Sequence, residues 1–120
     1  MLLPLALLAG LYSQNTDPTP MAQTSGLGLY QSCQLTTKPE NSLSENDHLR
    51  YVTCVVFVTA ITMGYEMGTK TRCVAAGTTN TQLGIIVYKY LDDHPEMLNL
   101  DPGTLTIRAV RQAFPCPVKH

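Results

Sequence analysis

The chain has 120 residues, which suits one small domain, and 44% of them are apolar, enough to fill a single core. Its formal net charge is −1, so no overall field would recruit nucleic acid or an acidic membrane surface. Only 14% of the residues are charged, which is low for a cytosolic domain.

An apolar segment opens the sequence. Residues 2–11 are almost wholly apolar, which fits the hydrophobic region of a signal peptide and is too short to span a bilayer. We expect residues 1–14 to be a signal peptide, although its usual basic start is missing, a gap that a misplaced start codon would explain. Residues 15–25 are polar and turn-forming, and should be a flexible mature N-terminus. The alternative is an apolar tag on a cytosolic protein.

A single helical domain is expected over residues 26–117. Ser25 or Gly26 would open a short first helix, in which apolar residues recur loosely at helical spacing up to Leu35. The following segment contains Pro39 and several capping residues, which indicates a loop. Two capping patterns lie at its end, one from Ser42 to Glu45 and a looser one from Ser44 to Asp47.

The stretch from His48 to Gly68 allows more than one interpretation. Its many β-branched residues favour a strand, but about seventeen residues without a turn signal are too long for an ordinary strand. Apolar residues recur at helical spacing and also cover most other faces, so we expect a central, buried helix. Strands and a membrane span are the alternatives, and several threonines argue against the span. The spaced apolar residues are Leu49, Val52, Val56, Ala60 and Met63.

Two further helices are predicted near the C-terminus. Thr79 and Gln82 form a capping box, and the strongest helical stripe of the sequence follows and must end before Pro95. Asp101 is a good N-cap for the last helix, with Pro102 at its first position. The stripe of the earlier helix consists of Leu83, Ile86, Val87, Tyr90 and Leu91, while Ile85 and Tyr88 lie outside it and indicate a second apolar surface.

Four cysteines have long spacings that do not suit a zinc site or a dithiol redox motif. Helices joined by a short link tend to lie antiparallel, which brings Cys73, just before one helix, next to Cys116, just after the next. The same reasoning pairs Cys33 with Cys54. We therefore expect an all-α bundle of about four helices braced by two disulfides, as in an exported protein.

No catalytic set, metal site or cofactor motif is evident. Neither a phosphate loop nor a known hydrolase or zinc motif is present. Disulfide bonding would remove the thiolate that a Cys–His hydrolase needs, and His94 suits the end of a helix. Acidic side chains at Asp92, Asp93 and Glu96 are expected to form a solvated surface. A small hydrolase therefore remains a weak alternative to a binding protein, for which Tyr65 and Tyr88 are candidate anchors.

The C-terminal pattern resembles that of a known family. Tyr90-Leu91, His94-Pro95-Glu96 and Ala113-Phe114-Pro115-Cys116 are similar to the closing segment of the Rap/Tai family of type VI secretion immunity proteins. Cys73, Gly77, Thr78 and Gln82-Leu83 resemble the family's central motif, and Gly64, Tyr65 and Gly68 its Gly-Tyr-x-x-Gly. The resemblance extends roughly from Gly26 to Cys116.

The resemblance implies a small all-helical periplasmic protein, commonly a homodimer, that is not an enzyme and does not insert stably into a membrane. Its partner would be a peptidoglycan amidase, a papain-like Cys/His hydrolase, whose cleft it blocks. Another periplasmic binding or chaperone-like adaptor module is the alternative.

An inserting plug must protrude and stay ordered. The segment from Tyr65 to Thr79 is our first candidate, and the segment from Leu35 to Asp47 is its rival. Contacts are expected from Tyr65, Glu66, Lys70 and Arg72, while Ile85 and Tyr88 would face either a second copy or the toxin.

Overall fold

The computed structural model describes residues 25–116, and this part of the chain folds into four α-helices without a strand. The helices are α2 (Gly26–Gln34), α3 (Glu45–Thr69), α4 (Asn80–Asp93) and α5 (Pro102–Ala113). Short 3₁₀ turns at η2 (Leu35–Thr37), η3 (Glu40–Ser42) and η4 (Pro95–Met97) lie in the connections. The expected all-α bundle is confirmed. The expected signal peptide over residues 1–14 and most of the expected N-terminal tail over residues 15–25 lie outside the described residues.

Side-chain caps fix where the helices begin. The Ser25 hydroxyl accepts from the amide of Gly28, the Ser44 hydroxyl from Asp47, and the Asp101 carboxylate from Thr104. The capping box predicted for α4 is complete, because Thr79 and Gln82 satisfy each other's backbone amides. Of the two patterns before α3, the looser one, from Ser44, supplies the cap.

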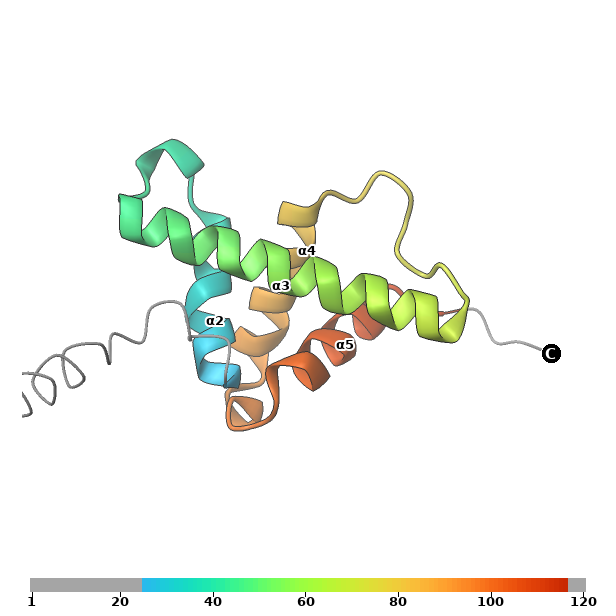
Figure 1. Cartoon of the computed structure of the whole chain (residues 1–120). Coiled ribbons are helices and arrows are strands. Elements are labelled where there is room, and N and C mark those ends of the chain that lie inside the picture. Colours follow the sequence, from blue (N-terminus) through green and yellow to red (C-terminus); the bar gives the residue numbers. More distant parts are fainter. Residues whose placement is uncertain (1–24, 117–120) are drawn as a thin grey trace, which may run out of the picture.

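The core lies where α2, α4 and α5 meet the inner side of α3 (Figure 1). In that view α3 crosses the other three helices, so the fold has two layers. Apolar side chains at helical spacing on α4 and α5 fill the space between the layers, and on α4 they include Leu83, Val87 and Leu91 of the predicted stripe. The fully buried members of the core are Leu29, Cys33, Cys54, Val58, Val87, Leu91 and Leu105.

The expectation of a central, buried α3 is only half right. The segment is one helix of 25 residues, so the strand interpretation is wrong. Its burial, however, is confined to a narrow stripe at Cys54, Val58 and Thr62. The apolar residues that the periodicity assigned to the core lie on the opposite side. Because α3 has neighbours on one side only, the other apolar side faces outward.

α3 is also the one helix in the described range that is long and apolar enough to cross a membrane, with 17% of its most apolar window buried. Length and composition alone support this, and α3 packs against α2, α4 and α5 in the fold.

Two disulfides tie the layers together with the predicted pairing. Cys33 bonds to Cys54 with Cα atoms 5.2 Å apart, and Cys73 bonds to Cys116 with Cα atoms 4.8 Å apart. The first bond is fully buried and joins α2 to α3. The second joins the segment after α3 to the segment after α5.

Candidate partner-binding surfaces

The connection between α3 and α4, residues 70–79, projects from the helical body (Figure 1). We call it the α3–α4 loop. It starts at Lys70, whose positive φ of 54° ends α3 in a left-handed turn, and it contains Gly77 at φ 88°. No regular structure supports the backbone between these points. Its order comes from side chains, from the disulfide at Cys73 and from one turn, in which the Thr78 backbone nitrogen donates to the Ala75 carbonyl oxygen.

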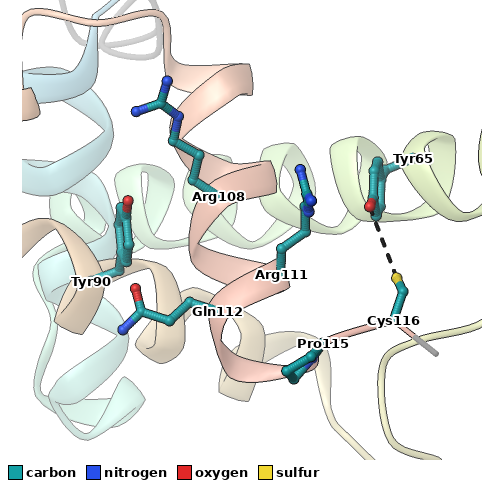
Figure 2. Close-up of a pocket in the computed structure, with 7 residues that line it drawn as sticks. All are labelled: Tyr65, Tyr90, Arg108, Arg111, Gln112, Pro115 and Cys116. Carbon is teal, nitrogen blue, oxygen red and sulfur yellow. Dashed lines mark hydrogen bonds between the residues drawn. The ribbon is translucent and has the colours of Figure 1, made fainter. Parts of the chain in front are cut away.

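Glu66 supplies part of that order. Its Oε2 atom accepts hydrogen bonds from the backbone nitrogen of Cys73 at 2.7 Å and from that of Val74 at 3.1 Å. Tyr65 lies beside it, and its hydroxyl is 3.9 Å from Cys116 Sγ (Figure 2). The sequence placed Tyr65 and Glu66 in the loop, whereas the structure has both on the last turns of α3. Tyr65 and Glu66 therefore support the base of the loop.

The cations expected at this surface are accessible. Lys70 and Arg72 are exposed and line a shallow hollow of about 330 Å³ together with Met63, Met67 and Thr71. An exposed guanidinium on an ordered loop suits recognition of a carboxylate on a partner. Within residues 25–116, neither the Lys70 nor the Arg72 side chain makes a hydrogen bond or an ion pair, so both are available to a partner.

Ile85 and Tyr88 lie elsewhere and are half-buried. Tyr88 stacks on Tyr30 with ring centroids 5.3 Å apart, and the Tyr30 hydroxyl donates to Asp92 Oδ1 at 2.8 Å. That hydrogen bond raises the pKa of Tyr30 to about 12. Ile85 lines a small hollow of about 220 Å³ beside Phe114. Both side chains thus pack partly against other residues of the same chain, which leaves only part of each available to a partner.

The rival segment, between α2 and α3, is ordered differently. Two 3₁₀ turns compact it, and His48 Nε2 lies 3.0 Å from Glu40 Oε1. It is anchored by the neighbouring Cys33–Cys54 bond and ends at the Ser44 cap. A hollow of about 690 Å³ lies where it joins α3, around Glu45 and Leu49.

Most of the exposed large apolar side chains in residues 25–116 lie on one side of α3, a surface that sequence reasoning missed. We call it the α3 outer face. Its side chains recur every three or four residues and include Leu49, 51% exposed, Val56, 60% exposed, and Met67, 74% exposed. The sequence stripe contained most of them, but periodicity alone does not say which side of a helix is covered. The face consists of Leu49, Val52, Val56, Ala60, Met63 and Met67.

The described residues hold no group of three His, Cys, Asp or Glu side chains that could bind a metal ion. All four cysteines are bonded. The ring of His94 stacks on Tyr90 with centroids 4.2 Å apart, and its Nδ1 lies 2.6 Å from the Tyr90 carbonyl oxygen. His94 therefore stabilises the end of α4.

A family model described as Rap1a immunity proteins matches residues 25–116. The chain belongs to the Rap1a immunity protein family. The matched region begins at the cap of α2 and ends at the last cysteine, so it contains all four helices and both disulfides. The comparison with curated proteins found no match, and neither did the comparison with solved structures.

Membership of the Rap1a immunity protein family indicates what the α3–α4 loop and the α3 outer face have to do. An immunity protein acts by binding a cognate effector, so accessible and ordered surface is the relevant property. The α3–α4 loop and the α3 outer face supply it in two forms, one polar and protruding, the other long and apolar. The disulfides are consistent with a protein outside the cytoplasm.

Proposed function

We propose that this protein binds a type VI secreted peptidoglycan amidase and occludes its active-site cleft, protecting the cell from intoxication by itself or its sisters. The observation that carries the proposal is the family match over the whole helical domain. The protein acts by shape, without a catalytic group of its own. The effector is a papain-like Cys/His hydrolase whose cleft must admit a peptide stem.

The α3–α4 loop is the part that enters the cleft. A plug keeps its affinity only if little conformational entropy is lost on binding. A disulfide and the Glu66 carboxylate restrain this loop before it meets its partner, which supports the assignment. Lys70 and Arg72 make the polar contacts, and Tyr65 supports the loop at its base. Ile85 and Tyr88, near the start and middle of α4, contribute to the rim.

A second copy of the chain covers the α3 outer face. Between Leu49 and Met67, a distance of about 27 Å along a helix, the only charged side chains on α3 are Arg50 and Glu66. The acidic first turn, with Glu45 and Asp47, lies at one end of the face, and Lys70 and Arg72 lie at the other. An antiparallel pairing of two α3 helices would bury the apolar side chains and place opposite charges together. The homodimer is therefore two-fold symmetric.

We place the protein in the periplasm, after removal of residues 1–14 as a signal peptide and without stable insertion into the membrane. Disulfides persist in that compartment, and peptidoglycan is there. In this arrangement α3 is covered by protein instead of lipid.

Protection from lysis tests the function. The chain, with and without residues 1–14, is co-expressed with each of a panel of periplasm-directed type VI peptidoglycan amidases, and lysis is scored. Protection by the exported chain against one of them is the expected result. Substituting Arg72 with Glu should abolish it, whereas the matched single change of Lys89 to Glu, on an exposed part of α4, should not. Lysis with every amidase, together with capture of other periplasmic proteins, would favour an adaptor.

A further inference from the structure

A separate hollow of about 430 Å³ lies where the last turns of α3, the end of α4 and the exposed side of α5 come together (Figure 2). Two arginines and two tyrosines dominate its lining. In Figure 2, Arg111 lies between Tyr65 on one side and Arg108 and Tyr90 on the other. The volume is in the range of small-ligand sites.

The donors of this hollow are paired with unusually weak acceptors. The Tyr90 hydroxyl donates to Met97 Sδ at 3.5 Å, and Arg108 Nη1 lies 4.0 Å from the same sulfur. The Tyr65 hydroxyl has only the disulfide sulfur of Cys116, at 3.9 Å. Thioether and disulfide sulfurs are poor acceptors. Each of these groups would gain by exchanging its sulfur contact for a contact with an oxygen.

The charge of the hollow is unbalanced. It contains two guanidinium groups and no carboxylate among its lining residues. Over residues 25–116 neither arginine has a carboxylate within ion-pair distance. Arg111 has no hydrogen-bond partner within that range either. A planar guanidinium is the side chain best suited to bind a carboxylate with two parallel hydrogen bonds.

We propose that this hollow binds a carboxylate group of a peptide ligand. Arg111 holds the carboxylate at the centre, Tyr65 and Tyr90 donate hydroxyl groups from the two sides, and Arg108 adds the second positive charge. The carboxylate belongs either to an acidic side chain or to a free peptide C-terminus, and the chemistry of recognition is the same. This binding site does not depend on the amidase-inhibitor function, although Tyr65 and Cys116 also support the base of the α3–α4 loop.

The test titrates the full mature chain, labelled with ¹⁵N, with three short peptides. Acetyl-Glu-Glu-amide carries only side-chain carboxylates, acetyl-Ala-Ala with a free C-terminus carries only a main-chain carboxylate, and acetyl-Gln-Gln-amide is the neutral control. We expect one of the two acids, and not the control, to shift the Arg111 and Arg108 side-chain signals. Which acid binds identifies the source. Binding of neither acid, or equal binding of the control, would overturn the proposal.

Variants then locate the site. Arg111→Gln is expected to weaken binding of the active acid about tenfold, the loss of one charge-assisted bidentate contact, and Tyr65→Phe to weaken it less. Lys89→Gln removes the same charge from exposed α4 surface outside the hollow and should leave binding unchanged. An equal effect of Arg111→Gln and Lys89→Gln would refute the site. Arg111→Gln should still protect against the amidase, so the two proposals fail separately.

Discussion

Glu66 Oε2 lies 2.7 Å from the backbone nitrogen of Cys73, and this hydrogen bond joins the end of α3 to the loop that follows it. A second bond, to Val74, makes the carboxylate a cap for two amides. The same stretch of loop is attached to the end of α5 through the Cys73–Cys116 bond. The Glu66 carboxylate and one disulfide bond therefore restrain the α3–α4 loop, which has no helix or strand of its own.

Replacing Glu66 with Ala should loosen the α3–α4 loop while the bundle stays folded. The partly buried backbone amides of Cys73 and Val74 lose a charged acceptor. We expect the free energy of unfolding to fall by about 1–3 kcal/mol. Hydrogen exchange of the Cys73 and Val74 amides should accelerate much more than exchange in α4 or α5. Glu45→Ala, which removes an exposed acid from the first turn of α3, is the control. Unchanged exchange in the loop would show that the disulfide alone orders it.

The two disulfides should differ in what they stabilise. Chain entropy predicts about 3 kcal/mol for the bond that closes 21 residues and about 4 kcal/mol for the bond that closes 43. Changing Cys33 and Cys54 to Ser also places hydroxyls in a fully buried site, which adds a desolvation cost. Urea unfolding should therefore show the larger loss for this pair. For the Cys73 and Cys116 pair, we expect a stable bundle with a disordered loop and lost protection against the amidase.

Local signals predicted most of the fold. Caps at Ser25, Ser44, Thr79 and Asp101 are contained in a few neighbouring residues, so the sequence located the helix starts well. The disulfide pairing followed from the antiparallel arrangement of two helices joined by a short link. Each of these inferences needed only nearby residues or one simple rule of packing.

The side on which α3 is buried could not be predicted, because it depends on where α2, α4 and α5 pack. Val58 is fully buried and Val56 is 60% exposed, yet the two are the same residue type two positions apart. The hollow around Arg111 was even harder to predict from the sequence. It is assembled from three helices, and its sulfur-paired donors are visible only once those helices are placed.

The α3 outer face should hold two copies together. Val56→Glu places a charge in the middle of the face, where dimerisation would leave it buried and unpaired. We expect the wild-type chain to sediment as a dimer and this variant as a monomer with unchanged circular dichroism. Gln31→Glu, an equivalent charge on exposed α2 surface, should remain dimeric. A wild-type chain that is monomeric at all concentrations would exclude this pairing.

The order of charges along α3 allows a sharper test of antiparallel pairing. Changing Lys70 to Glu brings like charges together, because the end of one α3 lies beside the acidic start of the other. Dimerisation should weaken, and the added change of Glu45 to Lys should restore it. If the second change gives no recovery, the helices are not antiparallel.

Tyr30 should ionise only at strongly alkaline pH. Its hydrogen bond to Asp92 raises the pKa to about 12 from an ordinary value near 10. Because the folded-state pKa is the higher one, the contribution to stability is fully present below pH 10 and is lost as the pH rises through 12. Absorbance at alkaline pH should show a phenolate that forms near pH 12. Asp92→Asn should move that phenolate toward lower pH, while Asp93→Asn should not.

Gly84 is needed because α4 passes very close to the Cys33–Cys54 region. A Cβ atom at this position would lie 2.8 Å from Thr36 Cγ2 and 3.3 Å from Cys54 Sγ. Thr36 is buried, and its hydroxyl donates to the Cys33 carbonyl oxygen at 2.6 Å, so it has little freedom to move. Although alanine favours a helix, we expect Gly84→Ala to destabilise the protein by about 1–3 kcal/mol through overpacking.

Two further variants separate overpacking from helix propensity. A Cβ on Gly64 meets nothing within 4 Å, so Gly64→Ala should stabilise α3 by about 0.5–1 kcal/mol. Thr36→Ser removes the clashing methyl and keeps the hydroxyl that donates to Cys33. Adding it to Gly84→Ala should recover much of the lost stability in urea unfolding, because the closest contact is gone. If Gly84→Ala alone is neutral, or if Thr36→Ser gives no recovery, the close approach between α4 and Thr36 does not limit residue choice at position 84.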